Sequence, residues 1–327
     1  MSVTATATVT AAAGPAPLGG LPTADPAWTT CCVDAFDLEP RLLETKGGVA
    51  PLALVRGRLE LIGATILFEP GDVVVADEGA RDRLLDAVAA ARRPLYLFRV
   101  PDGSPTIAAL RERMPIVTRR SAGSCPVIEI DGDPEAALSK RHRQDLRRAV
   151  RKAAPFGELT VDVHSPSADE VDALFDLALQ VEARSWKGTS GTALAIDARR
   201  ERFYRSYCAA AAAGGTLRIA FLRLGGEPAA MQIAVERGGA LWLLKIGYDD
   251  RFAAASPGQI LMLETLRWAW DRGLGRYEFL GAARDWTRAW TRTEWACSTV
   301  LAYPANPRGG VALAADSLRW ARRRIQT

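Results

Sequence analysis

The stretch from residue 241 to residue 270 most constrains the fold of this chain, because it has the pattern of a strand, a loop and a long helix. Residues 241–248 are mostly apolar and have the length of a buried strand. Ser256 and Pro257 then suit the N-cap and the first position of a helix. Gly258 follows, where free N–H groups and the helix dipole favour a bound anion. The stretch predicts either a phosphate- or pyrophosphate-binding helix N-terminus or an ordinary capped core helix.

The size and composition of the chain leave room for two domains. The chain has 327 residues, of which 48% are hydrophobic and 24% charged. Its net charge of +4 does not require a nucleic-acid partner, although positive charge is clustered at 141–152 and 319–324. No apolar run approaches the roughly 20 residues of a membrane span, and the first 20 residues have the composition of a disordered tail, not of a signal peptide. We expect a cytoplasmic protein.

Cysteine and histidine are too scattered for two common kinds of site. The five cysteines include a vicinal pair but no C-x-x-C spacing of the kind that binds zinc. The two histidines, His142 and His164, lie in a basic run and before a Ser-Pro turn. The sequence therefore predicts no metal site and no Ser-His-Asp triad, and the odd number of cysteines favours a reducing compartment.

The order of the predicted elements divides the chain into two α/β halves. The first half alternates strands with helices and contains a hairpin turned at Gly57. The second half has two helices, three strands separated by Gly-Gly turns, the glycine-bearing helix and two further strands. We expect a disordered tail at 1–25, an N-terminal domain at 26–133, a basic connecting helix at 134–157 and a C-terminal domain at 158–327 that ends in a terminal basic helix.

Several pieces of the sequence resemble the GNAT superfamily of acyl-CoA-dependent N-acyltransferases. More narrowly, they resemble its CelD-like branch, which is related to the Fem-type aminoacyltransferases. The pieces are 138–148, 182–186, 247–249 with 256–258, and 277–281. The resemblance covers about residues 45 to 305. It implies a mixed α/β fold of two tandem GNAT-like units, each a mostly antiparallel central sheet flanked by helices, with the coenzyme A pyrophosphate held at the helix N-terminus after the fourth strand.

The chain departs from the family pattern in two places. Its phosphate loop runs from Arg251 to Ser256-Pro257-Gly258, where many members have a glutamine or arginine followed by two closely spaced glycines. Trp286-Thr287 stands where the branch often has an aromatic–lysine pair, so no lysine contact is expected there.

The resemblance and the residue chemistry together give candidate site residues. Acyl transfer to an amine needs a deprotonated nucleophile and a proton for the leaving thiolate. The candidates for binding acyl-CoA are Arg251, Ser256, Pro257, Gly258 and Gln259. The candidates for catalysis are Tyr248 as the acid, Asp249 or Glu278 as the base, and Lys245 on the substrate-facing side of its strand. The candidates for binding the acceptor are Trp186 and Arg141.

Most of these candidates also have a structural interpretation. Asp249 could instead order its loop through the backbone, and Glu278 could form a salt bridge on an exposed face. Lys245 could extend to solvent, and Trp186 could be a core residue. The basic stretch at 141–152 is equally consistent with a solvated helix face.

We expect an enzyme that transfers an acyl group, most simply acetyl from acetyl-CoA, to a primary amine without a metal. By analogy the acceptor is an amino sugar or another small precursor of a polysaccharide or of the cell envelope. One alternative is a Fem-type aminoacyltransferase that uses charged tRNA, which the basic stretch slightly favours. The other is a non-catalytic GNAT-fold binding module, which the atypical phosphate loop favours. The terminal basic helix would make only weak contact with an anionic membrane surface.

Overall fold

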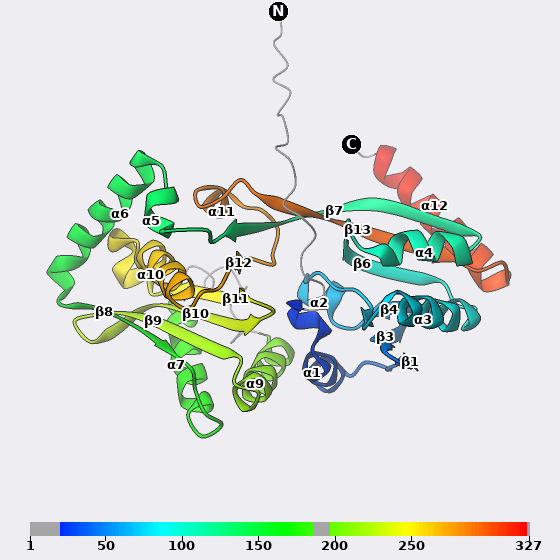
Figure 1. The fold of residues 1–327 in the computed structure, drawn as a ribbon, viewed down its shortest axis with the longest axis horizontal. Coiled ribbons are helices and arrows are strands. Elements are labelled where there is room, and N and C mark those ends of the chain that lie inside the picture. The colour runs from blue at the N-terminus through cyan, green and yellow to red at the C-terminus, as the bar shows by residue number, and fades with distance from the viewer. Residues whose placement is uncertain (1–19, 186–196, 326–327) are drawn as a thin grey trace, which may run out of the picture.

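The computed structural model describes residues 20–185 and 197–325, which contain one ten-stranded mixed sheet (Figure 1). Its strand order is β3-β4-β6-β13-β7-β12-β11-β10-β9-β8, and a small second sheet has the order β1-β2-β5. The strands are β1 (Leu43–Thr45), β2 (Gly48–Ala50), β3 (Leu52–Val55), β4 (Arg58–Leu61), β5 (Val74–Val75), β6 (Leu95–Pro101), β7 (Ile116–Glu129), β8 (Leu159–His164), β9 (Leu217–Leu224), β10 (Glu227–Arg237), β11 (Ala240–Tyr248), β12 (Arg276–Glu278) and β13 (Glu294–Tyr303).

Helices cover both faces of the large sheet, so the predicted mixed α/β fold of two units is confirmed. The α-helices are α1 (Pro26–Phe36), α2 (Ala64–Leu67), α3 (Glu78–Ala90), α4 (Pro105–Arg113), α5 (Pro134–Ala137), α6 (Lys140–Ala153), α7 (Val171–Ala183), α9 (Ala198–Ala213), α10 (Pro257–Asp271), α11 (Asp285–Arg288) and α12 (Pro307–Ile325). The 3-10 helices are η2 (Pro22–Ala24), η3 (Ala154–Phe156) and η5 (Asp250–Ala255). None of these helices, in the part of the chain described, is long and apolar enough to cross a bilayer.

Strands β7 and β13 join the first unit (β3, β4, β6 and their helices) to the second unit (β8 to β12 and their helices). Residues 116–126 of β7 pair with β13, and residues 127–129 pair with β12 of the second unit. Although β13 comes late in the chain, it lies between β6 and β7 in the first unit. Helix α12 follows it there, where Arg58 and Asp316 form an ion pair of 2.6 Å. The last strand and the terminal helix therefore pack on the first unit in space.

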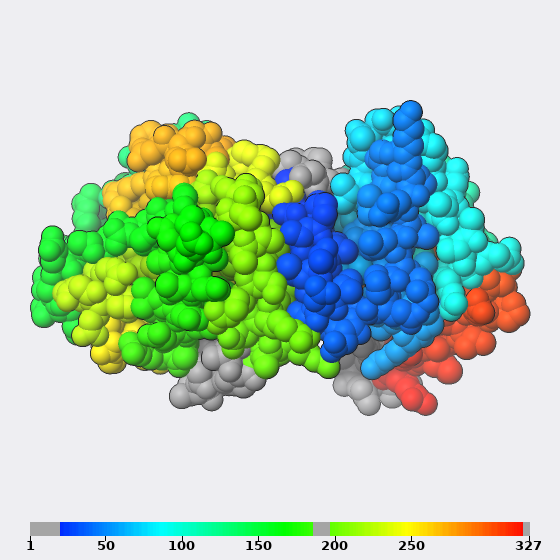
Figure 2. Space-filling model, turned by 90° about the horizontal axis from the view of Figure 1, so that it is seen from below, coloured from blue at the N-terminus to red at the C-terminus, as the bar shows by residue number. Residues whose placement is uncertain are grey.

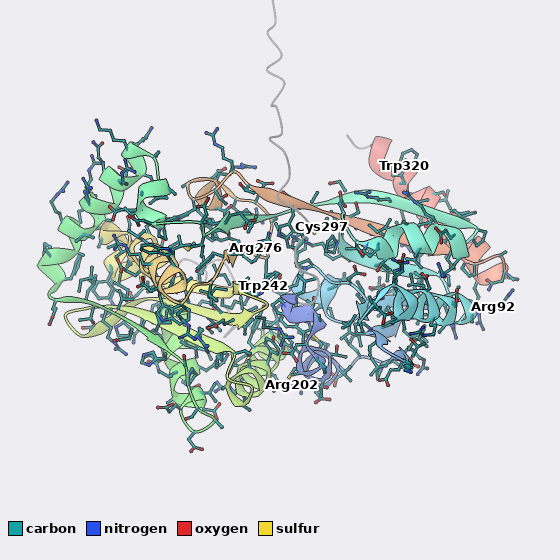
Figure 3. The ribbon with its side chains drawn as sticks, viewed as in Figure 1. Arg92, Arg202, Trp242, Arg276, Cys297 and Trp320 are labelled. Atoms are coloured by element: carbon teal, nitrogen blue, oxygen red, sulfur yellow. The ribbon has the colours of Figure 1, made fainter. Side chains whose placement is uncertain are left out.

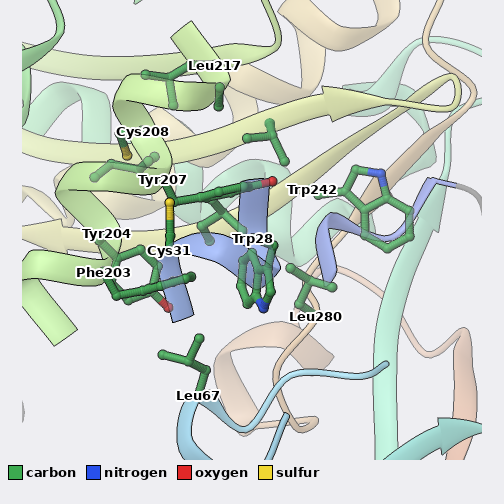
Figure 4. Packing of buried hydrophobic residues seen from close by; sticks show 14 of the residues in the cluster. Trp28, Cys31, Leu67, Phe203, Tyr204, Tyr207, Cys208, Leu217, Trp242 and Leu280 are labelled. Atoms are coloured by element: carbon green, nitrogen blue, oxygen red, sulfur yellow. The ribbon is translucent and has the colours of Figure 1, made fainter. Parts of the chain in front are cut away.

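Helix α1 crosses in the opposite direction: it comes early in the chain but packs on α9 of the second unit. The indole of Trp28 is fully buried, and it makes edge contacts with the rings of Phe203 and Tyr207 at 4.8 and 4.9 Å. Asp25 caps α1 through the Ala27 N–H and pairs with Arg237 at 2.7 Å. Figure 2 shows α1 between the two units, and Figure 4 shows the aromatic cluster around Trp28. The two units thus form one packed body.

Local sequence signals placed most of the elements correctly. The hairpin turned at Gly57, the Gly-Gly turns on either side of β10 and the helix at 198–213 are confirmed. The expected single basic helix after residue 134 is wrong, because the chain is extended at Leu138 and breaks into α5 and α6. Ser139 explains the break, since its hydroxyl accepts the His142 N–H at the start of α6.

Gly63→Ala tests how tightly α1 is held against the first unit. Gly63 has a φ of +77°, and a Cβ there would lie 2.5 Å from the Cys32 Sγ of α1. We expect the free energy of unfolding to fall by about 2–4 kcal/mol, from left-handed strain plus overpacking. Gly57→Ala is the matched control, because it has a φ of +81° but nothing within 4 Å. Equal losses in denaturant titrations of the two variants would contradict the close packing of α1.

Candidate functional site

The candidate site lies where two parallel strands separate. Strands β11 and β12 pair over only three residues, from Ala240 with Arg276 to Trp242 with Glu278. Beyond these pairs β11 continues to Tyr248, whereas the chain after β12 enters the loop that leads to α11. A cavity of about 900 Å³ lies between the diverging ends. Its walls are the end of β11, the first turn of α10 and the loop around α11, and Phe68 of the first unit completes them.

The N-terminus of α10 lies in the wall of this cavity. Ser256 occupies the N-cap position, but its side chain makes no capping hydrogen bond, so the expected cap is absent. Its φ of +49° places it in the left-handed region, which costs energy for a residue with a side chain. Pro257 is the first helical residue as expected, and the cavity also contacts Gly258 and Gln259. The first turn of α10 therefore has no capping side chain. Pro257 carries no N–H and the Gln259 N–H donates to the Ser256 carbonyl at 3.0 Å, so Gly258 supplies the N–H in the cavity wall that could meet an anion.

A buried polar network fixes α10 relative to the sheet. The amide oxygen of Gln232, on β10, accepts hydrogen bonds from the hydroxyls of Thr265 and Tyr277, both at 2.9 Å. All three side chains are buried, and Gln232 also reaches the cavity. Because these residues come from β10, α10 and β12, the network holds α10 in a fixed position on the sheet.

Lys245 and Tyr248, two of the candidate residues named from the sequence, line the cavity. The Lys245 ammonium lies 4.5 Å from the centre of the Tyr204 ring, a cation–π distance. Burial, and secondarily the charge of Asp250, raise the pKa of the Tyr248 phenol. Tyr248 is therefore protonated at neutral pH and can donate its proton.

Asp249 and Arg251 lie outside the cavity wall in the described residues. The Asp249 carboxylate is buried, accepts the Arg251 N–H at 2.9 Å and pairs with the guanidinium groups of Arg251 at 2.9 Å and Arg184 at 3.6 Å. Burial alone would raise the pKa of Asp249, but the bonds from Arg251 and the charge of Arg184 lower it overall. Arg251 also pairs with Glu227 at 2.8 Å. This arrangement orders η5 and offers no poised base.

Glu278 has a raised pKa, but its side chain points into the core. One carboxylate oxygen accepts the Trp295 indole N–H at 2.9 Å, and the other lies 3.0 Å from the Arg276 guanidinium. Burial raises its pKa from 4.5 to about 7, against the opposing effect of those two partners. Tyr277 and Phe279 pack on the α10 side of the sheet, so Glu278 lies on the other side.

Measuring the stability of the protein against pH checks the raised pKa of Glu278. The folded-state pKa of Glu278 is above its unfolded value, so the native protein binds the extra proton between pH 4.5 and about 7. The free energy of unfolding should therefore fall as pH rises through this window, by up to about 3 kcal/mol from this group. Glu278→Gln keeps an acceptor for Trp295 and should remove that part of the slope in urea titrations.

Glu69 is a functional candidate that sequence reasoning missed. The residue is 8% exposed, and its Oε2 accepts no hydrogen bond in the described structure. Burial raises its pKa to about 7, although the charges of Arg99 and Lys245 act in the opposite direction. Arg99 donates to the Phe68 and Leu280 carbonyls, which holds this segment of the first unit against the cavity. The only sequence signal was one acid between an apolar run and a Pro-Gly turn.

The structure places only one of the two candidates for binding the acceptor. Trp186 lies outside the described residues. Arg141 is an exposed residue of α6 and does not contact the cavity. Helix α6 itself packs on α10 and η5, and the His142 ring makes an edge contact of 4.5 Å with Trp290 in the cavity wall.

Residues 140–288 match the acetyltransferase (GNAT) domain family. The match spans α6 to α11, which includes all the residues that line the cavity except Phe68 and Trp290. This match and the two-unit fold agree with the resemblance of the sequence to the GNAT superfamily of acyltransferases.

The fold is similar to solved structures over nearly the whole chain. L-PGS from Bacillus licheniformis is 14% identical, with a TM-score of 0.59 over 93% of this chain and 99% of that one. The C-terminal domain of a candidate lysylphosphatidylglycerol synthetase from Agrobacterium fabrum is 12% identical, with a TM-score of 0.58 over 89% and 92%. FemX is 12% identical, with a TM-score of 0.57 over 83% and 90%. At these identities the likeness shows the shared fold. No curated protein sequence matches significantly.

Proposed function

We propose that the cavity binds an acyl-CoA, most simply acetyl-CoA, and that the protein transfers its acyl group to a primary amine. The observation that carries this proposal is the uncapped N-terminus of α10, with Gly258 in its first turn, in the wall of a cavity between separating strands. N–H groups and the helix dipole at such a position favour a pyrophosphate. The diverging ends of β11 and β12 leave room for the rest of the coenzyme and for the acceptor.

The reaction requires one proton to leave the amine and one to reach the sulfur. The neutral amine attacks the thioester carbonyl, the C–N bond forms and the C–S bond breaks, and the departing thiolate takes a proton. Tyr248 is the proposed acid, because it lines the cavity and its raised pKa keeps the phenol protonated. Lys245 lies on the same strand and orients a polar or anionic part of the acceptor.

Glu69 is the proposed base among the three carboxylates near the site. A general base works best with a pKa near the working pH, and the pKa of Glu69 is about 7. Asp249 is held ionised by two arginines, and Glu278 is engaged by Trp295 on the core side. Glu69 does not itself line the cavity, but it directly follows Phe68, which does, and one of its carboxylate oxygens accepts no hydrogen bond from the described residues.

Thermal unfolding with added ligands tests the proposal. A ligand that binds only the folded state at 100 times its Kd adds about 2.7 kcal/mol, which moves the melting temperature measurably. We expect shifts with coenzyme A and acetyl-CoA and none with adenosine. A melting temperature unmoved by every CoA species would refute the proposed donor.

By family analogy the acceptor is an amino sugar or a small envelope or polysaccharide precursor in the cytoplasm. The cavity can be screened with such amines once donor binding is established, by following release of the free thiol. The acceptor should raise thiol release above the rate of hydrolysis.

A second candidate donor is an aminoacyl-tRNA. The exposed basic face of α6 lies beside α10, so a phosphate backbone could run along it into the site. If tRNA is the donor, Arg141→Glu with Arg151→Glu should weaken tRNA binding and reduce its salt slope by about 1 for each lost phosphate contact. Arg111→Glu, on the exposed side of α4, is the control. Filter-binding titrations at several salt concentrations separate the two donors.

A further inference from the structure

A second cavity, of about 950 Å³, lies on the first unit between the large sheet and α12. We call it the arginine cleft. Its floor is formed by β4, β6, β7 and β13, and one wall is the length of α12 from Pro307 to Trp320. Figure 1 shows α12 on the half of the molecule away from α10, so this cleft is separate from the proposed acyl-CoA site.

The arginine cleft is strongly basic. Six arginines line it against two carboxylates, those of Glu60 and Asp316. Asp316 is already paired with Arg58 at 2.6 Å and with Arg319 at 3.4 Å. The remaining four arginines form no ion pair within the described part of the chain: Arg56, Arg93, Arg120 and Arg308. The excess positive charge around one hollow suits a phosphate, which guanidinium groups bind in a bidentate manner.

Part of the floor of the cleft, on β6 and β13, is apolar. The rings of Tyr96 and Phe98 are parallel, with an interplanar angle of 2° and centres 6.5 Å apart, and Leu301 lies buried beside them. Val311 and Trp320 stand at the rim, with 72% and 44% of their surface exposed. Figure 3 shows Trp320 near the carboxyl end of α12. A ligand that fills this cleft therefore has an anionic group and an apolar body.

The exposed side chains of α12 indicate where such a ligand would be found. Leu318 is 63% exposed and lies seven residues after Val311, on the same side of the helix. Arg308, Arg319 and Arg322 are exposed along the same helix. A helix with exposed apolar side chains and flanking arginines suits the interface of an anionic membrane, whereas a small soluble phosphate would contact none of the outward apolar residues.

We propose that the arginine cleft binds the phosphate of an anionic phospholipid while Val311, Leu318 and Trp320 of α12 contact the membrane surface. The cleft takes the headgroup and the first part of the apolar body, and the charge of the cleft selects anionic over zwitterionic lipid. The proposal does not depend on which donor or acceptor the α10 cavity uses.

Vesicle sedimentation of the full chain tests the proposal. Wild type should bind vesicles of phosphatidic acid in phosphatidylcholine and should not bind phosphatidylcholine alone. Arg120→Glu and Arg308→Glu should each weaken binding about 10-fold, because each basic side chain near a surface contributes on the order of 1 kcal/mol and reversal removes more. Arg111→Glu, outside the cleft, is the matched control for net charge. Leu318→Asp should weaken vesicle binding without touching the cleft.

Three results would overturn the proposal. The first is absence of binding to anionic vesicles at low salt. The second is an equal loss in Arg111→Glu and the cleft variants, which would indicate general charge attraction. The third is binding of inorganic phosphate or dihexanoyl phosphatidic acid that depends on Arg120 and Arg308, with vesicle binding indifferent to Leu318→Asp, which would indicate a soluble phosphate ligand. An unchanged melting temperature of each variant shows that the fold is kept.

Discussion

Gly258→Asp is expected to weaken acyl-CoA binding about 100-fold while the protein keeps its fold. The substitution places a carboxylate in the first turn of α10, where the proposed pyrophosphate binds. Two like charges about 6 Å apart in partly screened surroundings repel by about 3 kcal/mol, which is ~100-fold in Kd. The helix dipole favours an acidic residue in the first turn, so stability should hold or rise.

Gly258→Ala is the matched control for size. A Cβ at this position comes no closer than 3.8 Å to the protein, at the Tyr248 ring, which is an ordinary contact. The alanine variant should therefore bind acyl-CoA within a few-fold of wild type. Calorimetric titration of both variants with acetyl-CoA tests whether the pyrophosphate binds at Gly258. Tight binding by Gly258→Asp would place the pyrophosphate elsewhere, and weak binding by both would point to a bulky group against the backbone at Gly258.

Glu69→Gln is expected to lower kcat by about 10²- to 10⁴-fold, the usual contribution of a general base. The amide cannot accept the proton of the amine, but it has nearly the shape of the carboxyl, so the fold should be kept. The KM for acyl-CoA should change little, because Glu69 is not at α10. In wild type the rate should rise as pH increases through about 7, since the base must lose its proton. The variant should lack that rise.

Glu278→Gln is the control for the effect of Glu69→Gln on the rate. Both glutamates are buried with a pKa of about 7, so an effect of removing any such group would appear in both variants. We expect Glu278→Gln to alter stability against pH but to retain the rise in rate near pH 7. A pH–rate profile unchanged by Glu69→Gln, with a profile flattened by Glu278→Gln, would exchange their roles.

Local chemistry in the sequence was sufficient to locate α10 and β11. Apolar length, turn glycines and Pro257 at the first helical position act over a few residues, and those elements formed where expected. The same information could not settle the role of Asp249, because an aspartate after a strand suits both a base and a loop-ordering residue. The ion pairs of Asp249 with Arg251 and Arg184 show that it orders the loop. Arg184 follows α7, which is far from Asp249 in the sequence.

Long-range contacts explain what the sequence did not predict. Glu69 belongs to the first unit, and its neighbour Phe68 is held near the site because Arg99 donates to the carbonyls of both Phe68 and Leu280. The polar side chains of Arg119, Arg120 and Ser121 do not suggest a buried strand, yet β13 pairs with that segment of β7. Packing of α1 on α9 likewise joins residues that are far apart in the chain.

The position of β13 has a consequence for how the protein is made. The sheet of the first unit lacks its inner strand until residues 294–303 have left the ribosome. Until then β6 and β7 have unpaired edges facing a gap, and such edges attract other chains. Nascent chains that end before β13 should therefore aggregate or bind chaperones, and the first unit should become protease-resistant only when synthesis is nearly complete.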